Sequence, residues 1–280
     1  MKIFMCWDME GASGIYSREQ VWYWEPLSRP ELAAEGRALL TADANAAARA
    51  ALDAGVDELL VCDTHHGGGN LLLDEVLKDP RITWIPRSRG EQDGKQRWMP
   101  GLDETVDGFM VPGHHAKAGT PFAFLPHTST GAWADFRING RSVGEMGLQA
   151  CFAGHWDVPV CFAQGDKATC REAHDMFPGI VTACVKRSVA RDTATGPVPA
   201  EARLLTARKV AEAVQALHDR RCRPFKVALP MTVTIRTFRA DEAERIAKRA
   251  NVERVDDCTV QCTVPRQCDV LKWVTGTGLP

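Results

Sequence analysis

The chain has 280 residues, of which 45% are hydrophobic and 25% are charged, and its formal net charge is −2. These values are typical of a globular protein with one large α/β domain, or with a main domain and a smaller companion. They exclude a broad basic surface, so we expect neither nucleic acid nor a membrane as a partner.

The N-terminal apolar run stops at Asp8 and is too short for the core of a secretory signal. No stretch approaches the roughly 18 apolar residues of a membrane helix. We therefore expect a cytoplasmic protein whose ten cysteines are free thiols. Cys6, Cys62 and Cys161 lie in apolar runs and are expected in the core.

Apolar runs and helical patterns alternate along the first 220 residues. In chain order they predict a strand at 2–7, a helix at 30–55, and strands at 58–62, 82–85 and 108–111. A strand at 136–138, a helix at 142–156, a strand at 158–163, a helix at 167–177, a strand at 180–185 and a helix at 200–220 follow. This order predicts an α/β fold with a mostly parallel central sheet flanked by helices.

The helix predicted at 142–156 has a clear start signal. Asn139-Gly140 forms a hairpin turn before it, Ser142 is the expected N-cap, and Glu145 occupies the third helical position of a capping box.

The last part of the chain changes character, because residues 226–238 and 252–264 alternate in the manner of strands around a helix at 241–250. We expect a smaller β-rich C-terminal region. The predicted division is an α/β metal-binding catalytic domain at 1–190 and an α+β region at 191–280 that packs on the same body.

Polar residues with metal-binding chemistry follow several of the predicted strands. The first strand ends in Asp8 and Glu10, which point the same way in an extended segment and repel each other unless a cation or proton intervenes. Five of the eight histidines lie between positions 65 and 127, namely His65, His66, His114, His115 and His127. Loops at the carboxyl ends of parallel strands form the ligand crevice of such sheets, so these groups are expected to converge.

Each of these residues, taken singly, has an ordinary structural explanation as a turn, capping or hydrogen-bonded residue. Together with Glu145, they offer more donors than one tetrahedral zinc ion needs. Carboxylates and imidazoles suit zinc, manganese or cobalt, and the number of donors favours two ions that share one carboxylate. The glycines at 67–69 lack the spacing of a dinucleotide fingerprint and the lysine of a P-loop.

Five segments give the chain a resemblance to the zinc-dependent D-aminopeptidase family of the DppA type. They are residues 8–14 (DMEGASG), 63–65 (DTH), 113–116 (GHHA), the region around His127, and 139–148 (NGRSVGEMGL). Their order and approximate spacing match the family over residues 1 to about 190, and the tail from about 200 matches poorly.

The resemblance implies two zinc ions per subunit, with manganese or cobalt as other fitting metals. By resemblance, Asp8 bridges the two ions, Glu10 and His65 complete one of them, and His115 and Glu145 complete the other. It implies that His127 lies beside the metals and is the catalytic residue. The implied substrates are short peptides with N-terminal D-residues, such as D-Ala-D-Ala and D-Ala-Gly-Gly, and the implied assembly is a homodecamer.

The sequence also departs from the family pattern. His66 and the three glycines replace a more polar loop, and His114 stands where an aromatic residue is expected. These departures bear on substrate preference and assembly more than on the metal pair. Two other functions stay open, a metal hydrolase of another amide or of an ester such as a phosphoester, and a catalytically silent small-molecule binding protein. The presence of His127 beside the five expected ligands favours an enzyme.

Overall fold

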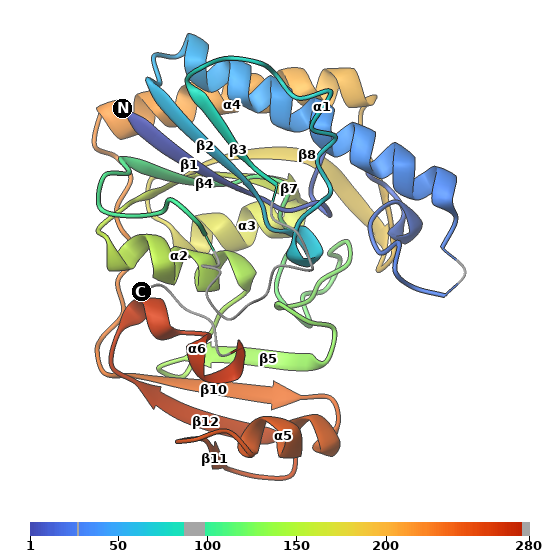
Figure 1. The fold of residues 1–280 in the computed structure, drawn as a ribbon. Coiled ribbons are helices and arrows are strands. Elements are labelled where there is room, and N and C mark those ends of the chain that lie inside the picture. Colours follow the sequence, from blue (N-terminus) through green and yellow to red (C-terminus); the bar gives the residue numbers. More distant parts are fainter. Residues whose placement is uncertain (27, 87–98, 276–280) are drawn as a thin grey trace.

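The computed structural model describes residues 1–26, 28–86 and 99–275, and a seven-stranded sheet runs through its larger part (Figure 1). The strand order is β3-β2-β1-β4-β7-β8-β9. The strands are β1 (Lys2–Trp7), β2 (Glu58–Asp63), β3 (Ile82–Ile85), β4 (Gly108–Val111), β7 (Val160–Asp166), β8 (Val181–Ala190) and β9 (Thr193–Thr195). All neighbours pair in parallel except β8 and β9, which confirms the predicted mostly parallel sheet.

Helices cover both faces of this sheet. They are α1 (Pro30–Asp53) and α4 (Pro199–His218) on one face, and α2 (Glu145–His155) and α3 (Lys167–Met176) on the other (Figure 1). Alternation along β1 explains the two layers, because Ile3 and Met5 join the apolar core with α1 and α4. Phe4 and Cys6 point the opposite way and join the core on the side of α2.

A second, five-stranded antiparallel sheet lies beyond α2 (Figure 1). Its order is β11 (Glu253–Arg254), β12 (Thr259–Val264), β10 (Met231–Thr237), β5 (Trp133–Ile138) and β6 (Arg141–Ser142). Helix α5 (Ala240–Ala247) packs against it, and the chain continues through α6 (Lys272–Thr275). The predicted β-rich C-terminal region is thus confirmed.

The start of α2 differs from the sequence prediction. Ser142 is not the N-cap, because the Asn139-Gly140 hairpin continues far enough for Ser142 to pair with Arg137 in β6. Its hydroxyl bonds to Asp135 Oδ1 at 2.7 Å, and the helix begins at Glu145 with Gly144 as N-cap. Glu145 therefore lies in the first turn, where the helix dipole favours a carboxylate.

The predicted division at residue 190 stays a prediction. Strands from both sides of that position pair, since β5 lies next to β10, and α4 packs on α1. Within the described ranges, none of the helices is both long and apolar enough to cross a membrane.

All ten cysteines lie in the described ranges, and no disulfide is found among them. Cys6, Cys62 and Cys161 are fully buried, which confirms their predicted place in the core.

Candidate metal centre

The carboxyl ends of three adjacent strands bring the predicted donors together. Asp8 follows β1, His65 follows β2, and His115 follows β4, and these strands are neighbours in the order β2-β1-β4. All three side chains are buried. The parallel order explains why residues so far apart in the sequence meet at one edge.

Two loops of this edge are in direct backbone contact. Gly11 N donates to Gly113 O at 2.6 Å, and Asp8 N donates to Pro112 O at 3.1 Å. A side chain at Gly11 would begin 2.2 Å from His114 O, and one at Gly113, whose φ is +73°, would begin 2.1 Å from Asp8 O. Only glycine permits this approach.

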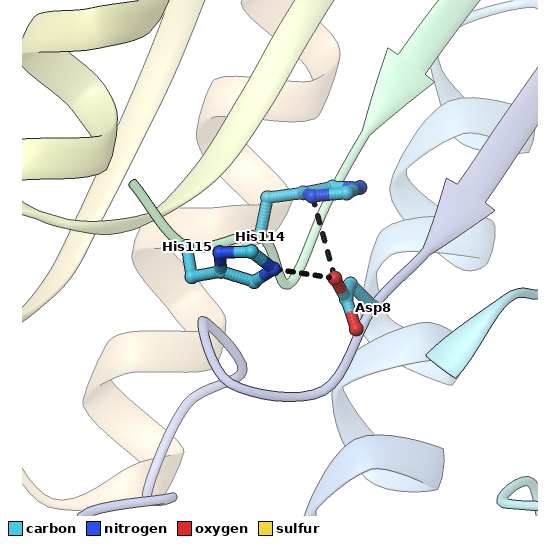
Figure 2. Close-up of side chains that lie close together, drawn as sticks. All are labelled: Asp8, His114 and His115. Atoms are coloured by element: carbon cyan, nitrogen blue, oxygen red, sulfur yellow. Dashed lines mark ion pairs between the residues drawn. The ribbon is translucent and has the colours of Figure 1, made fainter. Parts of the chain in front are cut away.

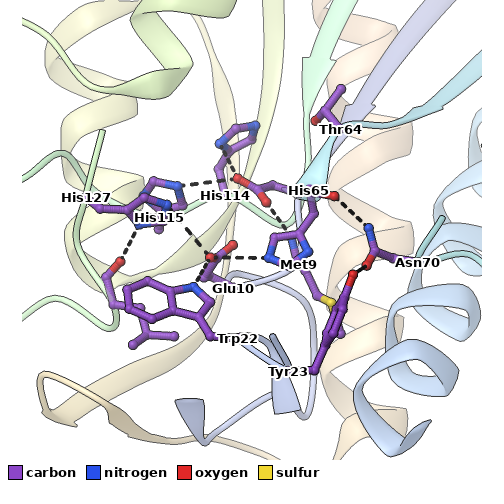
Figure 3. A network of polar contacts seen from close by, with 12 residues as sticks. Met9, Glu10, Trp22, Tyr23, Thr64, His65, Asn70, His114, His115 and His127 are labelled. Atoms are coloured by element: carbon purple, nitrogen blue, oxygen red, sulfur yellow. Dashed lines mark hydrogen bonds and ion pairs between the residues drawn. The ribbon is translucent and has the colours of Figure 1, made fainter. Parts of the chain in front are cut away.

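The first donor group consists of Asp8, Glu10 and His65, whose donor atoms all lie within 4.8 Å of one another. Glu10 Oε1 is 3.6 Å from His65 Nε2 (Figure 3). The same oxygen accepts a hydrogen bond of 2.8 Å from Trp22 Nε1. Glu10 Oε2 and both ring nitrogens of His65 have no hydrogen-bond partner.

A second donor group consists of Asp8, His114 and His115. Asp8 Oδ2 lies 3.4 Å from His114 Nδ1 and 3.4 Å from His115 Nε2 (Figure 2). The other His115 nitrogen, Nδ1, lies 3.1 Å from the Ala116 carbonyl. A carbonyl only accepts, so Nδ1 carries a proton and Nε2 is the nitrogen that faces Asp8.

Glu145 approaches the centre from the first turn of α2. Its Oε2 is 3.6 Å from His115 Nε2 and accepts a hydrogen bond of 2.7 Å from Ser129 N. Among the side chains that the structure describes, the tight donor groups do not include Glu145. It therefore lies beside the second group, where it faces His115.

His127 stacks on His115 with ring centroids 3.7 Å apart. Its Nδ1 lies 2.9 Å from Leu125 O, so Nδ1 bears the proton, and its Nε2 lies 3.9 Å from Glu10 Oε1 (Figure 3). The ring also meets the edge of Trp22 at 5.4 Å. His127 thus directs an unprotonated nitrogen toward the centre, where Glu10, His115 and His127 form a third group of close donor atoms.

Next to His127 is a cavity of about 220 Å³, whose lining also includes Gly119, Pro126, Gly131 and Arg191. Ligand pockets commonly measure roughly 300–1,000 Å³, so the space beside the centre suits a small ligand.

A layer of polar contacts supports the donors. Asp63 accepts hydrogen bonds from Asn70 N at 2.6 Å and Asn70 Nδ2 at 2.9 Å, and Asn70 Nδ2 also donates to His65 O at 2.7 Å. Lys186 is buried on β8 and donates to Glu10 O at 2.6 Å and to Ile15 O. Asp63 therefore fixes the loop after His65 rather than its ring, and Lys186 fixes the loop after β1.

Burial and mutual repulsion set the charges of the centre. Burial and the charge of Glu10 raise the pKa of Asp8 to about 7. Burial opposes protonation of His65, but the charge of Glu10 prevails and raises its pKa to about 9. Burial and His115 lower the pKa of His127 to about 4. Without a cation, protons shared among Asp8, His65 and His115 offset the negative charges of Glu10 and Glu145.

The residues fit a metal on two counts. A nitrogen and an oxygen bound to one zinc ion at about 2.0–2.1 Å in a tetrahedron lie about 3.3–3.4 Å apart, close to the 3.4–3.6 Å separations of the two groups. Buried polar atoms without hydrogen bonds are rare and costly, and here they cluster on the donors, at Glu10 Oε2, His115 Nε2 and both nitrogens of His65 and His114.

The match to known proteins agrees with this geometry. A model of the D-aminopeptidase family, peptidase family M55, matches residues 1–275. The chain belongs to this family. A D-aminopeptidase of Bacillus subtilis (strain 168) is 34% identical over 216 residues, which are 77% of this chain and 74% of that protein. Membership confirms the resemblance found in the sequence and makes the chain an aminopeptidase with a buried metal-binding donor set.

A solved structure of the same family has the same fold. It is the Zn-dependent D-aminopeptidase DppA from Bacillus subtilis, described as a self-compartmentalizing protease. The TM-score is 0.88 at 29% identity, and the match covers 98% of this chain and 95% of that one.

The structure brings together Asp8, Glu10, His65, His115 and His127, and it places Glu145 against His115. Sequence reasoning counted His114 among the candidate donors but did not assign it to a metal, and it gave no role to Trp22. The doubled histidine at 114–115 is a signal for the first, whereas nothing in the local sequence connects Trp22 with Glu10.

Proposed function

We propose that this chain is a dinuclear zinc aminopeptidase that releases N-terminal D-amino acids, such as D-Ala, from short peptides. The observation that carries the proposal is that two donor groups share Asp8, one with Glu10 and His65 and one with His114 and His115. A carboxylate common to two groups of donors is the usual arrangement of a two-metal hydrolase site. The zinc dependence and D-peptide activity named for the relatives support the choice of metal and substrate.

In the proposed site, Asp8 would serve both ions, Glu10 and His65 would hold one, and His115 and Glu145 would hold the other. Bound zinc supplies Lewis acidity, which polarises a peptide carbonyl and lowers the pKa of a water molecule to about 7. Manganese or cobalt would suit the same oxygen and nitrogen donors.

His127 is the proposed catalytic residue. Its ring is neutral at pH 7, because burial and His115 lower its pKa to about 4. Its Nε2 faces the centre and can accept a proton from the attacking water and then deliver it to the leaving amine. Its Nδ1 stays bonded to Leu125 O, which keeps the ring oriented during both transfers.

The small cavity beside His127 supports short peptides as substrates. Self-compartmentalization, described for DppA, supports a homo-oligomer, and we propose a homodecamer. Light scattering on the purified protein would test this with an expected mass of ten times the 30.8 kDa chain.

The proposed function is tested by metal analysis and peptide hydrolysis before and after chelation. We expect two zinc ions per chain, and release of D-Ala from D-Ala-Gly-Gly that stops on chelation and returns with zinc. L-Ala-Gly-Gly and a generic phosphodiester serve as comparison substrates. Preferential cleavage of either one, or full activity in the metal-free protein, would contradict the proposal.

A further inference from the structure

His114 is a buried imidazole at the centre to which neither the family resemblance nor the proposed function gives a role. Its side chain is fully buried. Its Nδ1 lies 3.4 Å from Asp8 Oδ2, the same distance as His115 Nε2 from that oxygen (Figure 2). Two adjacent residues at the end of β4 thus direct one nitrogen each at one carboxylate oxygen.

The contacts of His114 are those of a ligand nitrogen rather than of a core histidine. Buried histidines ordinarily satisfy their ring nitrogens with hydrogen bonds, but neither nitrogen of His114 has a hydrogen-bond partner of normal geometry. The separation of 3.4 Å from Asp8 Oδ2 is long for a hydrogen bond and close to the distance between two donors on one zinc ion.

A neutral imidazole has one lone pair for a metal and one N–H for an outer partner. The side chain of Gln149 interacts with the ring of His114. Metal-bound imidazoles ordinarily donate their second N–H to such an outer partner.

We propose that His114 is a third imidazole ligand of the metal pair and that it binds, with Asp8 and His115, the ion on the β4 side. This inference rests on the proposed dinuclear site. Glu145, which is 3.6 Å from His115 Nε2, is then the next donor to the same ion.

Two substitutions separate ligation from hydrogen bonding. In His114→Asn, the side-chain amide replaces Nδ1 as a hydrogen-bond donor to Asp8 but offers no imidazole lone pair, whereas His114→Phe removes both functions. The matched control is His66→Asn, because His66 follows the predicted ligand His65 as His114 precedes His115, and it lies outside the three donor groups found among the described residues.

The readouts are zinc per chain by mass spectrometry and zinc affinity by chelator competition. We expect both His114 variants to lose more than about 100-fold in affinity for one ion, beyond the 10–100-fold typical of an outer partner, while the second ion stays bound. His66→Asn is expected to keep both ions. Unchanged affinity in His114→Asn would overturn the inference, because a hydrogen bond would then suffice.

A measurement on the unsubstituted enzyme keeps the test decisive if the buried substitutions prevent folding. In the cobalt-loaded protein with ¹⁵N-labelled histidine, each metal-bound imidazole gives a strongly shifted N–H resonance. Repeating the spectrum with His127→Ala removes any contribution of that ring. Three such resonances, from His65, His114 and His115, support the inference, and two overturn it.

These outcomes also separate the two proposals. An unsubstituted enzyme that binds fewer than two zinc ions would contradict the proposed function itself. Two ions that survive His114→Asn with unchanged affinity would contradict only the role of His114.

Discussion

Trp22 Nε1 donates a 2.8 Å hydrogen bond to Glu10 Oε1, the same oxygen that lies 3.6 Å from His65 Nε2. The indole thus holds a proposed metal ligand at the same oxygen that faces the imidazole. We expect Trp22→Phe, which keeps the aromatic bulk and loses this bond, to lower zinc affinity roughly 10–100-fold. Chelator competition measures the change.

Trp24→Phe is the matched control, because Trp24 stacks on His66 and is 40% exposed. It should leave zinc affinity unchanged. Equal affinities in the two tryptophan variants and the unsubstituted protein would show that the indole bond does not hold Glu10.

His127→Ala should reduce turnover of D-Ala-Gly-Gly by roughly 10²–10⁴-fold, the usual contribution of a general acid–base group. Both zinc ions should remain, since His127 acts on protons in the proposed mechanism. Turnover number and metal content are measured together, with the exposed His174→Ala as control. Loss of an ion from His127→Ala would instead make His127 a ligand.

Lys186→Met should destabilise the fold, because it leaves the carbonyls of Glu10 and Ile15 buried without their donor. The expected loss is about 1–3 kcal/mol for each carbonyl, measured by urea unfolding of the metal-free protein. Lys248→Met removes an exposed ion pair with Glu244 and should change stability by less than about 1 kcal/mol. Similar losses in both variants would contradict the anchoring role of Lys186.

Zinc binding should release protons, because raised pKa values keep some donors of the metal-free centre protonated near pH 7. Asp8, with a pKa of about 7, and His65, with a pKa of about 9, hold protons that zinc must displace. Apparent affinity should therefore rise with pH between about 7 and 9, by about tenfold per pH unit for each proton released. Calorimetry at pH 7 in two buffers of different ionisation enthalpy counts the protons, and a count of zero would contradict the expected linkage.

The architecture of the main sheet was predictable because its strands carry short apolar runs. β1 shows this well, since both of its faces are buried and every residue from Ile3 to Trp7 is apolar. The start of α2 was not predictable from local spacing. Ser142 fits a capping box in the sequence, but pairing with Arg137 across the hairpin takes precedence.

The site residues likewise differ in whether local sequence or tertiary contacts determine their position. Asp8, Glu10, His65 and His115 could be predicted because each follows a strand end, and parallel strands place such ends at one edge. The roles of Trp22 and Lys186 depend on the path of the loop after β1 and on strand order, which local patterns do not encode. The bonds of Asp63 to Asn70 depend likewise on how the glycine-containing loop folds back.

The glycine contact between the loops after β1 and β4 limits how this centre can be moved or redesigned. The backbone of each loop leaves no room for a side chain at Gly11 or Gly113 of the other. The conformation of each loop therefore depends on contact with the other. If the loop after β1 were grafted alone into another protein, it would lack the backbone surface that stabilises its conformation. The centre is transferable only as a pair of loops, and variants that diversify one of them must keep both glycines.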